Sequence, residues 1–389
     1  MPPNTYTVSS EVHSACILPG FDPRGQIAKT CQDLNYVVLD SALLAIEFDG
    51  HGKEGHHVVN FCKKEAMLAF QAALKDPGSP QQFLVDLINA CDSKLKEFGS
   101  GVDASYSGTT AVAVLINNGT LYCAGVGDSR AVLGTSKPPE ITYAEQPPRG
   151  EERLVLQNVM RRRSVQVDHP LEAVQLTKDQ KPEDPEELDR ITKAGGIVRR
   201  LLDENGRNIG PWRVWRRDCN YPGLAMSRSI GDAVGAELGV TSTPHLSTHS
   251  LQEEDAFIVA ASDGVWDVME NSEVVDFVEA YRHSCQRGTF SEVNTDVNAK
   301  PENATIAQLL CEEARMRWLA IVEDEDVVID DISCVIIEFR DSDVHIVQPP
   351  DRSTYPNMDA KDVPELQAES GVPKSDVRLR DPRRASMSD

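Results

Sequence analysis

The stretch SGTTAVAVLINNGTLYCAGVGDSRAVL, residues 107–133, constrains the fold more than any other part of the sequence. Two runs rich in aliphatic and β-branched residues flank Asn117-Asn118-Gly119, a strong signal for a tight hairpin. A second turn follows at Gly127-Asp128. Strands joined by such short turns must be antiparallel, since parallel strands need a long crossover connection.

The rest of the chain repeats this block-wise pattern. Residues 35–48 predict another hairpin around Asp40-Ser41, and 256–262 and 332–339 predict buried strands. Apolar residues at helical spacing predict paired helices over 53–76 and 80–98, and again over 271–283 and 304–319. Because helices and strands come in separate blocks, the pattern favours an antiparallel α+β layered domain over a parallel βαβ sheet.

Composition excludes several classes of function. The 389 residues carry a net charge of −23, so phosphate backbones are repelled and nucleic acid is not an expected partner. No run of about 18 apolar residues predicts a membrane span, and no secretory signal is expected. The nine cysteines are scattered without a C-x-x-C pair, which favours reduced thiols in the cytoplasm or the nucleus over disulfides or zinc.

Aspartates stand at the ends of four predicted strands. Asp49 and Asp263 each follow an apolar run and precede glycine, Asp128 follows Gly127, and Asp330 precedes the last strand. Rigid strands can bring such carboxylates together, and hard oxygen ligands suit Mg²⁺ or Mn²⁺. The alternative is that each Asp-Gly pair is only a turn, as is common for these residues.

Six segments then resemble, in order, the motifs of the metal-dependent serine/threonine protein phosphatases of the 2C type, most like plant and protist members. The segments are FDGHG, SGTTAVAVLI, AGVGDSRAVL, PGLAMSRSIGDAVG, ASDGVWDVMENSEVV and DDISCVIIEF. The resemblance covers about residues 25–340 and implies a central antiparallel β-sandwich flanked by helix pairs, a four-layer α-β-β-α arrangement.

The resemblance also implies a set of site residues. Asp49 would bridge two Mg²⁺ or Mn²⁺ ions, the carbonyl of Gly50 would bind one of them, and Asp263 and Asp330 would complete the second. Asp128 would join Asp263 at a weaker third ion, with Asp232 as candidate support. Asp33 would reach a metal through water, and His51 would be the general acid.

The expected chemistry agrees with these residue types. Two ions acidify a bridging water and neutralise phosphate charge, so water attacks phosphorus in line without a protein nucleophile. The serine or threonine leaving group needs a proton, which His51 beside the cleft can supply. The expected partners are phosphorylated proteins, and the enzyme is expected to be a monomer.

The sequence departs from the family pattern where a basic residue commonly grips the phosphate. That position is Ala28 here, and Lys29 is the neighbouring candidate for phosphate binding. This departure keeps open a pseudophosphatase that acts as a binding or scaffold module. A Cys-dependent phosphatase is disfavoured because Cys334, the start of a C-x₅-R spacing, lies in an apolar run without a glycine-rich phosphate loop.

The predicted organisation is a lead-in over 1–24, a catalytic domain over 25–345 and a polar tail over 346–389. The domain carries polar insertions at about 135–175 and 284–303. In the tail, RRAS places Ser386 in a context typical of basophilic kinase sites. Trp212 and Trp215 are expected to border the cleft, with partner contact and core packing both open.

Overall fold

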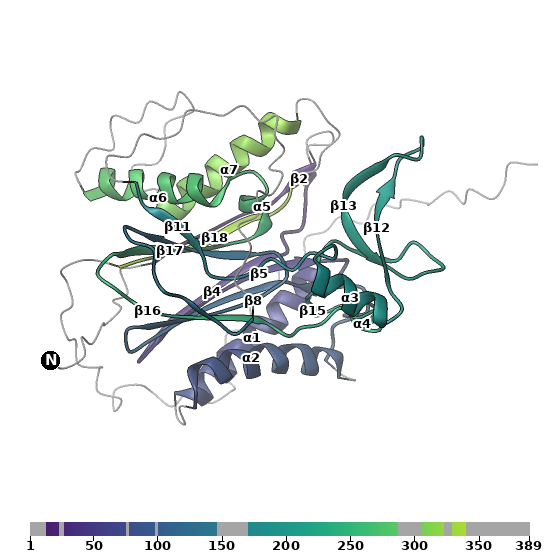
Figure 1. The fold of residues 1–389 in the computed structure, drawn as a ribbon, viewed down its shortest axis with the longest axis horizontal. Helices are drawn as coiled ribbons and strands as arrows, with labels where there is room; N and C mark the ends of the chain where they lie inside the picture. The colour runs from purple at the N-terminus through teal and green to yellow at the C-terminus, as the bar shows by residue number, and fades with distance from the viewer. Residues whose placement is uncertain are drawn as a thin grey trace, which may run out of the picture. The chain divides into compact units, whose positions relative to one another are not determined.

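Two antiparallel β-sheets pack face to face in the computed structural model, and helices cover both outer faces (Figure 1). The structure describes residues 13–22, 27–74, 78–97, 100–145, 170–286, 305–322 and 329–339. All of these lie in the first of two units, residues 1–347. The predicted α+β class and its α-β-β-α layers are confirmed.

Each sheet is built from strands that are distant in sequence. The first sheet has the order β1 (His13–Leu18), β18 (Ile332–Glu338), β17 (Asp255–Ala261), β9 (Arg130–Thr135) and β11 (Glu172–Gln175). The second has the order β10 (Thr142–Tyr143), β16 (His245–Ser250), β8 (Thr120–Val126), β7 (Ala111–Asn117), β5 (Leu43–His51), β6 (Gly108–Thr109) and β15 (Ile230–Gly231), and β4 (Asp33–Leu39) pairs with β5.

Strand β5 shows how sequence alternation creates the layers. Leu44 and Phe48 point to the cluster beneath α1 (Gly55–Ala73) and α2 (Pro80–Lys96), whereas Leu43 and Ala45 point to the cluster between the sheets. A strand with both faces buried reads as a continuous apolar run, as residues 42–46 do. The strand therefore has little freedom at its far end, where Asp49 lies.

The other outer layer covers the first sheet. It comprises α5 (Asp263–Trp266), α6 (Asn271–Gln286) and α7 (Ile306–Val322). Two buried indoles fix the turn after β17: Trp266 Nε1 donates to Ala261 O, the last residue of the strand, at 2.9 Å, and Trp318 Nε1 on α7 donates to Gly264 O on α5 at 2.8 Å. Since Gly264 follows Asp263, these bonds fix the backbone beside a predicted site residue.

A third sheet stands apart from the sandwich (Figure 1). It consists of β12 (Ile197–Leu202), β13 (Asn208–Trp215) and β14 (Pro222–Leu224), and residues 197–224 are called the flap below. A small cluster including Ile191, Val214 and Leu238 packs its base against α3 (Pro185–Lys193) and the turn after α4 (Ala233–Ala236). A two-stranded ribbon, β2 (Phe21–Asp22) and β3 (Ile27–Ala28), lies near the start of the described chain.

Several features predicted from the sequence can be compared with this fold. β1 lies in the segment expected to be a lead-in, yet it pairs with β18 along its whole length. Short strands β10 and β11 lie within the expected 135–175 insertion, whose residues 146–169 are outside the described part. Of the insertion expected at 284–303, residues 287–303 are also outside it. The tail and Ser386 are also outside it. Among the described helices, none is both long and apolar enough to cross a bilayer.

Candidate metal and phosphate site

Asp33 and Asp49 lie directly opposite each other at the open end of the β4–β5 hairpin. Like charges in this position destabilise a sheet, so the pair calls for a compensating partner. Burial, followed by the charges of Asp331 and Asp330, raises the pKa of Asp33 to about 7, even though the Ser333 hydroxyl donates to Asp33 Oδ2 at 2.5 Å. Asp33 Oδ1 is buried and has no hydrogen-bond partner among the described residues.

Asp49 is the centre of the acidic cluster. Burial raises its pKa well above the ordinary value, and the charges of Asp33, Asp263, Asp330 and Asp128 raise it further, in that order. Its backbone is held on both sides by Thr110, whose N–H donates to Asp49 O at 2.9 Å and whose hydroxyl accepts from Asp49 N at 3.3 Å. The strand therefore holds a carboxylate where four others repel it.

Gly50 occupies a position that admits no side chain. A Cβ there would lie 2.7 Å from Gln32 O and 2.9 Å from both Gly55 O and Val59 Cγ1. Gly50 N donates to Gln32 O at 3.0 Å, so the backbone beside Asp49 is fixed. The glycine is thus required by the close approach of β5, the loop before β4 and the start of α1.

The first sheet contributes Asp263, which follows β17, and Asp330, which precedes β18. Burial raises the pKa of Asp263 well above its ordinary value, and the charges of Asp267, Asp128 and Asp330 add to the shift. Asp267 lies four residues after Asp263 in the segment SDGVWD, but it was not among the predicted site residues. The neighbouring Asp331 binds the backbone: its carboxylate accepts hydrogen bonds from Gly20 N at 2.6 Å and from Gln32 N at 2.8 Å.

Two lysines face this cluster. Lys29 Nζ lies 3.0 Å from Asp330 Oδ1, and although burial alone lowers the pKa of Lys29, Asp330 and its acidic neighbours raise it overall. Lys181 pairs with Asp128. Lys181 was also missed from the sequence; it follows Gln180, whose amide oxygen accepts from Gly127 N at 2.6 Å and so fixes the turn that carries Asp128.

The donor set fits Mg²⁺ or Mn²⁺ in kind, because it consists of carboxylate oxygens gathered around Asp49. Among the described residues, however, no three acidic, histidine or cysteine side chains already form a ready-made metal site. A cation between Asp49 and its neighbours would offset their repulsion, and the side chains must turn toward it to enclose it. The fold thus brings the predicted ligands into one acidic cluster, but their side chains are not yet arranged as a coordination shell.

His51, at the end of β5, pairs with Asp232. Its Nε2 lies 2.6 Å from Asp232 Oδ2, which also accepts from the Ser229 hydroxyl at 2.6 Å. Burial lowers the pKa of His51, but the charge and hydrogen bond of Asp232, together with the charge of Asp128, raise it overall. Asp232 was predicted as candidate support for a third metal; the structure places it behind His51. A Cβ at Gly108 would collide with this carboxylate.

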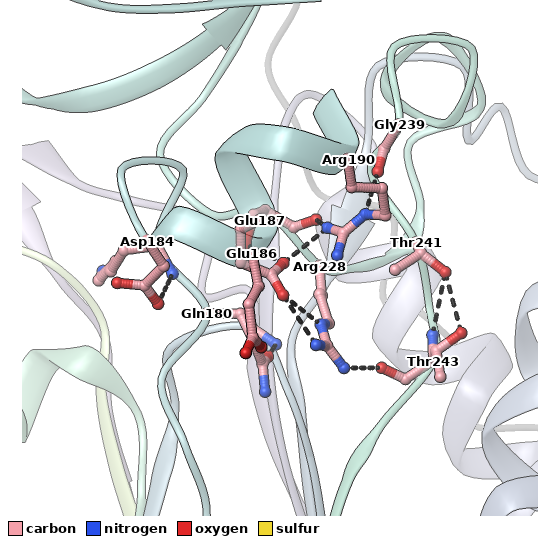
Figure 2. Close-up of polar contacts among 12 residues, drawn as sticks. Gln180, Asp184, Glu186, Glu187, Arg190, Arg228, Gly239, Thr241 and Thr243 are labelled. Carbon is pink, nitrogen blue, oxygen red and sulfur yellow. Dashed lines mark hydrogen bonds and ion pairs between the residues drawn. The ribbon is translucent and has the colours of Figure 1, made fainter. Parts of the chain in front are cut away.

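A buried ionic network joins α3 to Arg228 (Figure 2). Glu187 on α3 accepts from Arg228 Nη2 at 2.7 Å, from Arg190 Nη2 at 2.6 Å and from the Ser227 hydroxyl at 2.6 Å. Burial alone raises the pKa of Glu187, but these partners outweigh it and hold the pKa at about 2. Since Arg228 lies four residues before Asp232, the network fixes the approach of Asp232 to His51.

Comparisons with known proteins agree with this geometry. The family model described as "Protein phosphatase 2C" matches residues 38–317. The rice protein named "Probable protein phosphatase 2C 48" is 32% identical over 320 residues, which cover 77% of this chain and 76% of that protein. Rice "Probable protein phosphatase 2C 64" is 36% identical over 62% of this chain, and the match spans only 50% of that relative's length.

Two solved structures share the fold. A serine-threonine phosphatase 2C from Toxoplasma gondii superposes with a TM-score of 0.59 at 19% identity, covering 87% of this chain and 98% of that one. A sex determining protein of C. elegans gives a TM-score of 0.58 at 17% identity, covering 85% and 66%. At these identities the structures support the fold alone, whereas the family match spans most of the chain. The chain belongs to the protein phosphatase 2C family.

Proposed function

We propose that this chain is a metal-dependent protein serine/threonine phosphatase. The observation that carries the proposal is the gathering of four carboxylates around Asp49, with His51 two residues further on the same strand. Such a cluster has no evident purpose in a binding module, because its mutual repulsion weakens the fold. It becomes useful when divalent cations and a phosphate group share it.

The chain's own residues divide the work of holding the ions. Asp49 and the Gly50 carbonyl would hold two Mg²⁺ or Mn²⁺ ions, with Asp263 and Asp330 completing one of them and Asp33 acting through water. Asp128, together with Asp263 and the newly placed Asp267, would hold a weaker third. Bound in this way, the ions supply neutralisation of phosphate charge and acidification of water.

His51 is suited to deliver the proton to the leaving oxygen. Asp232 binds Nε2 and raises the pKa, which keeps the imidazole protonated nearer to neutral pH. Nδ1 has no hydrogen-bond partner among the described residues and is therefore the nitrogen that can donate. Water attacks phosphorus in line, the bond to the serine or threonine oxygen breaks, and His51 protonates that oxygen.

The substrates proposed are phosphoserine and phosphothreonine proteins, and the enzyme is proposed to act as a monomer in the cytoplasm or the nucleus. The free thiols of the described cysteines support a reducing compartment. Lys29 is a candidate contact for the phosphate because it already lies against Asp330. Ser386 remains a proposed kinase site.

Phosphate release from a phosphothreonine peptide tests the function. We expect turnover with Mn²⁺ that is lost in EDTA and in Asp263→Asn, while Asp218→Asn on the exposed loop of the flap keeps it. Folded wild-type protein that binds Mn²⁺ but releases no phosphate would instead support the pseudophosphatase alternative.

A further inference from the structure

The flap is positively charged in a strongly acidic chain. Residues 197–224 contain six arginines and three acidic residues, whereas the whole chain has 39 basic and 62 acidic residues. Among the described residues, no ion pair engages Arg199, Arg200, Arg207 or Arg213; Arg216 pairs with Glu237. A local concentration of unpaired positive charge on a negative protein attracts an acidic partner to that place.

Two of these arginines are arranged at a cost to the fold. Arg199 and Arg213 are directly opposite each other on β12 and β13, where like charges destabilise the pairing. Arg199 stacks on Trp215 at 4.6 Å and donates from Nη2 to Asn220 Oδ1 at 2.5 Å, and Arg213 donates from Nη1 to Gly223 O at 2.7 Å. Arg213 Nε is buried and lacks a hydrogen-bond partner among the described residues. Both groups therefore keep a positive charge that no described carboxylate offsets, and a carboxylate placed between them would relieve their repulsion.

A continuous set of contacts joins this pair to the candidate site. Gly223 lies two residues after Tyr221, whose ring packs edge-on against Tyr106 with centroids 5.9 Å apart. The carbonyl of Tyr106 lies against Gly52, the residue that follows His51. Tyr106 and Tyr221 are 53% and 40% exposed, so the aromatic pair presents an open surface between the histidine and the arginines. A polypeptide leaving the site across the two rings would meet the flap.

We infer that the face of the flap formed by Arg199 and Arg213, with Tyr106 and Tyr221 between it and His51, binds an acidic segment of the phosphoprotein substrate. This inference rests on the proposed function and adds a substrate class to it: phosphoserine or phosphothreonine flanked by aspartate and glutamate. Arginine suits this task because its planar fork binds a carboxylate through two parallel hydrogen bonds.

Two phosphothreonine peptides test the inference, one flanked by Asp and Glu and one with Asn and Gln at the same positions. With Mn²⁺ and low salt, wild type is expected to show a kcat/KM for the acidic peptide about fivefold above that for the neutral one, mainly through KM. This preference should shrink at physiological ionic strength, where exposed charges more than roughly 8 Å apart are largely screened from each other.

Arg199→Gln/Arg213→Gln should bring the ratio of the two kcat/KM values close to one. The matched control Lys64→Gln/Lys137→Gln removes the same charge from exposed positions on α1 and after β9 and should keep the ratio. Because Arg199 and Arg213 also support Trp215 and Gly223, Arg207→Gln/Arg217→Gln, at two exposed flap positions, provides a second test that does not depend on those contacts. It should lower the ratio by about half.

The outcomes separate this inference from the proposed function. If neither peptide is hydrolysed, the proposed function fails. Equal kcat/KM for both peptides in wild type overturns the acidic-segment inference while the phosphatase stands. A preference for the acidic peptide that survives in both flap variants overturns the assignment of the binding surface to the flap. Sedimentation of wild type at rising concentration tests the last alternative, in which the surface binds a second copy of the chain. A dimer that the flap substitutions dissociate, in an enzyme without peptide preference, would establish that alternative and overturn the inference.

Discussion

The carboxylate cluster and the flap carry opposite charges and are built in opposite ways. Asp49 stands at the end of a strand with both faces buried, and its backbone is bonded to Thr110 on both sides. The flap rests on one small apolar cluster at its base and exposes Leu202, Ile209 and Trp212. Carboxylates that repel each other stay together only on a rigid backbone. A surface that binds polypeptides of different sequence needs exposed area, and only its base has to pack on the core.

The largest effect is expected at the rigid region. Asp49→Asn should lower peptide turnover with Mn²⁺ about a thousandfold, because this residue is common to both proposed metal positions. In EDTA the same variant should unfold at a higher temperature than wild type, since the amide removes one of the repelling charges. Phosphate release and thermal unfolding measure the two effects. Retained turnover would contradict the assignment of Asp49 as a ligand.

A second prediction concerns the network that joins α3 to the Asp232 loop. Glu187→Gln should destabilise the fold by about 3 kcal/mol at neutral pH, because it leaves Arg228 with a weaker partner in a buried setting. Glu186→Gln, on the same helix but exposed, is the control. Urea unfolding checks both, and an equal effect of the two substitutions would show that the network contributes little.

The pH dependence of that difference follows from the sign of the pKa shift. The pKa of Glu187 falls from 4.5 to about 2 on folding, so the carboxylate contributes stability above pH 4.5. This contribution is lost as the pH falls from about 4.5 toward 2, where folded wild type also becomes protonated. The difference between wild type and Glu187→Gln should therefore shrink across this range.

A third prediction separates proton delivery from metal binding. Asp232→Asn should lower turnover of a phosphothreonine peptide about a hundredfold, while p-nitrophenyl phosphate, whose leaving group needs no proton, should lose much less. Because Asp232 raises the pKa of His51, the fall of activity on the alkaline side should move to lower pH in the variant. Equal losses for both substrates, with no movement of the pH profile, would assign Asp232 to metal binding instead.

The same contrast explains what could be predicted from the sequence. Strand-end aspartates such as Asp49 and Asp263 follow apolar runs, and tight turns such as Asn118-Gly119 are local signals. The flap strands escaped prediction because arginine, glycine and proline interrupt their alternation, and their base is stabilised by packing on α3. The His51–Asp232 contact joins residues 181 positions apart, which no local pattern reveals. Lys181 is likewise placed by a distant contact, the hydrogen bond from Gly127 N to the side chain of its neighbour Gln180.

The smallest effect is expected for Trp212, and its comparison with Trp215 distinguishes the two tryptophans of the flap. Trp215 is 4% exposed, donates from Nε1 to Arg199 O at 2.9 Å and lies under the Arg199 guanidinium, whereas Trp212 is 41% exposed. Trp215→Ala should therefore cost about 3 kcal/mol of stability if the flap unfolds together with the sandwich. Trp212→Ala should change the free energy of unfolding by no more than about 0.5 kcal/mol.

Urea unfolding of the two variants checks this difference, with proteolysis of the flap as a local measurement. If Trp215→Ala leaves global stability unchanged but makes the flap readily cleaved, the flap unfolds independently of the sandwich. That result would sharpen the contrast with the carboxylate cluster, because the docking surface would then have its own local stability. Equal global losses for Trp212→Ala and Trp215→Ala would contradict it, since the exposed indole would then be as important to the fold as the buried one.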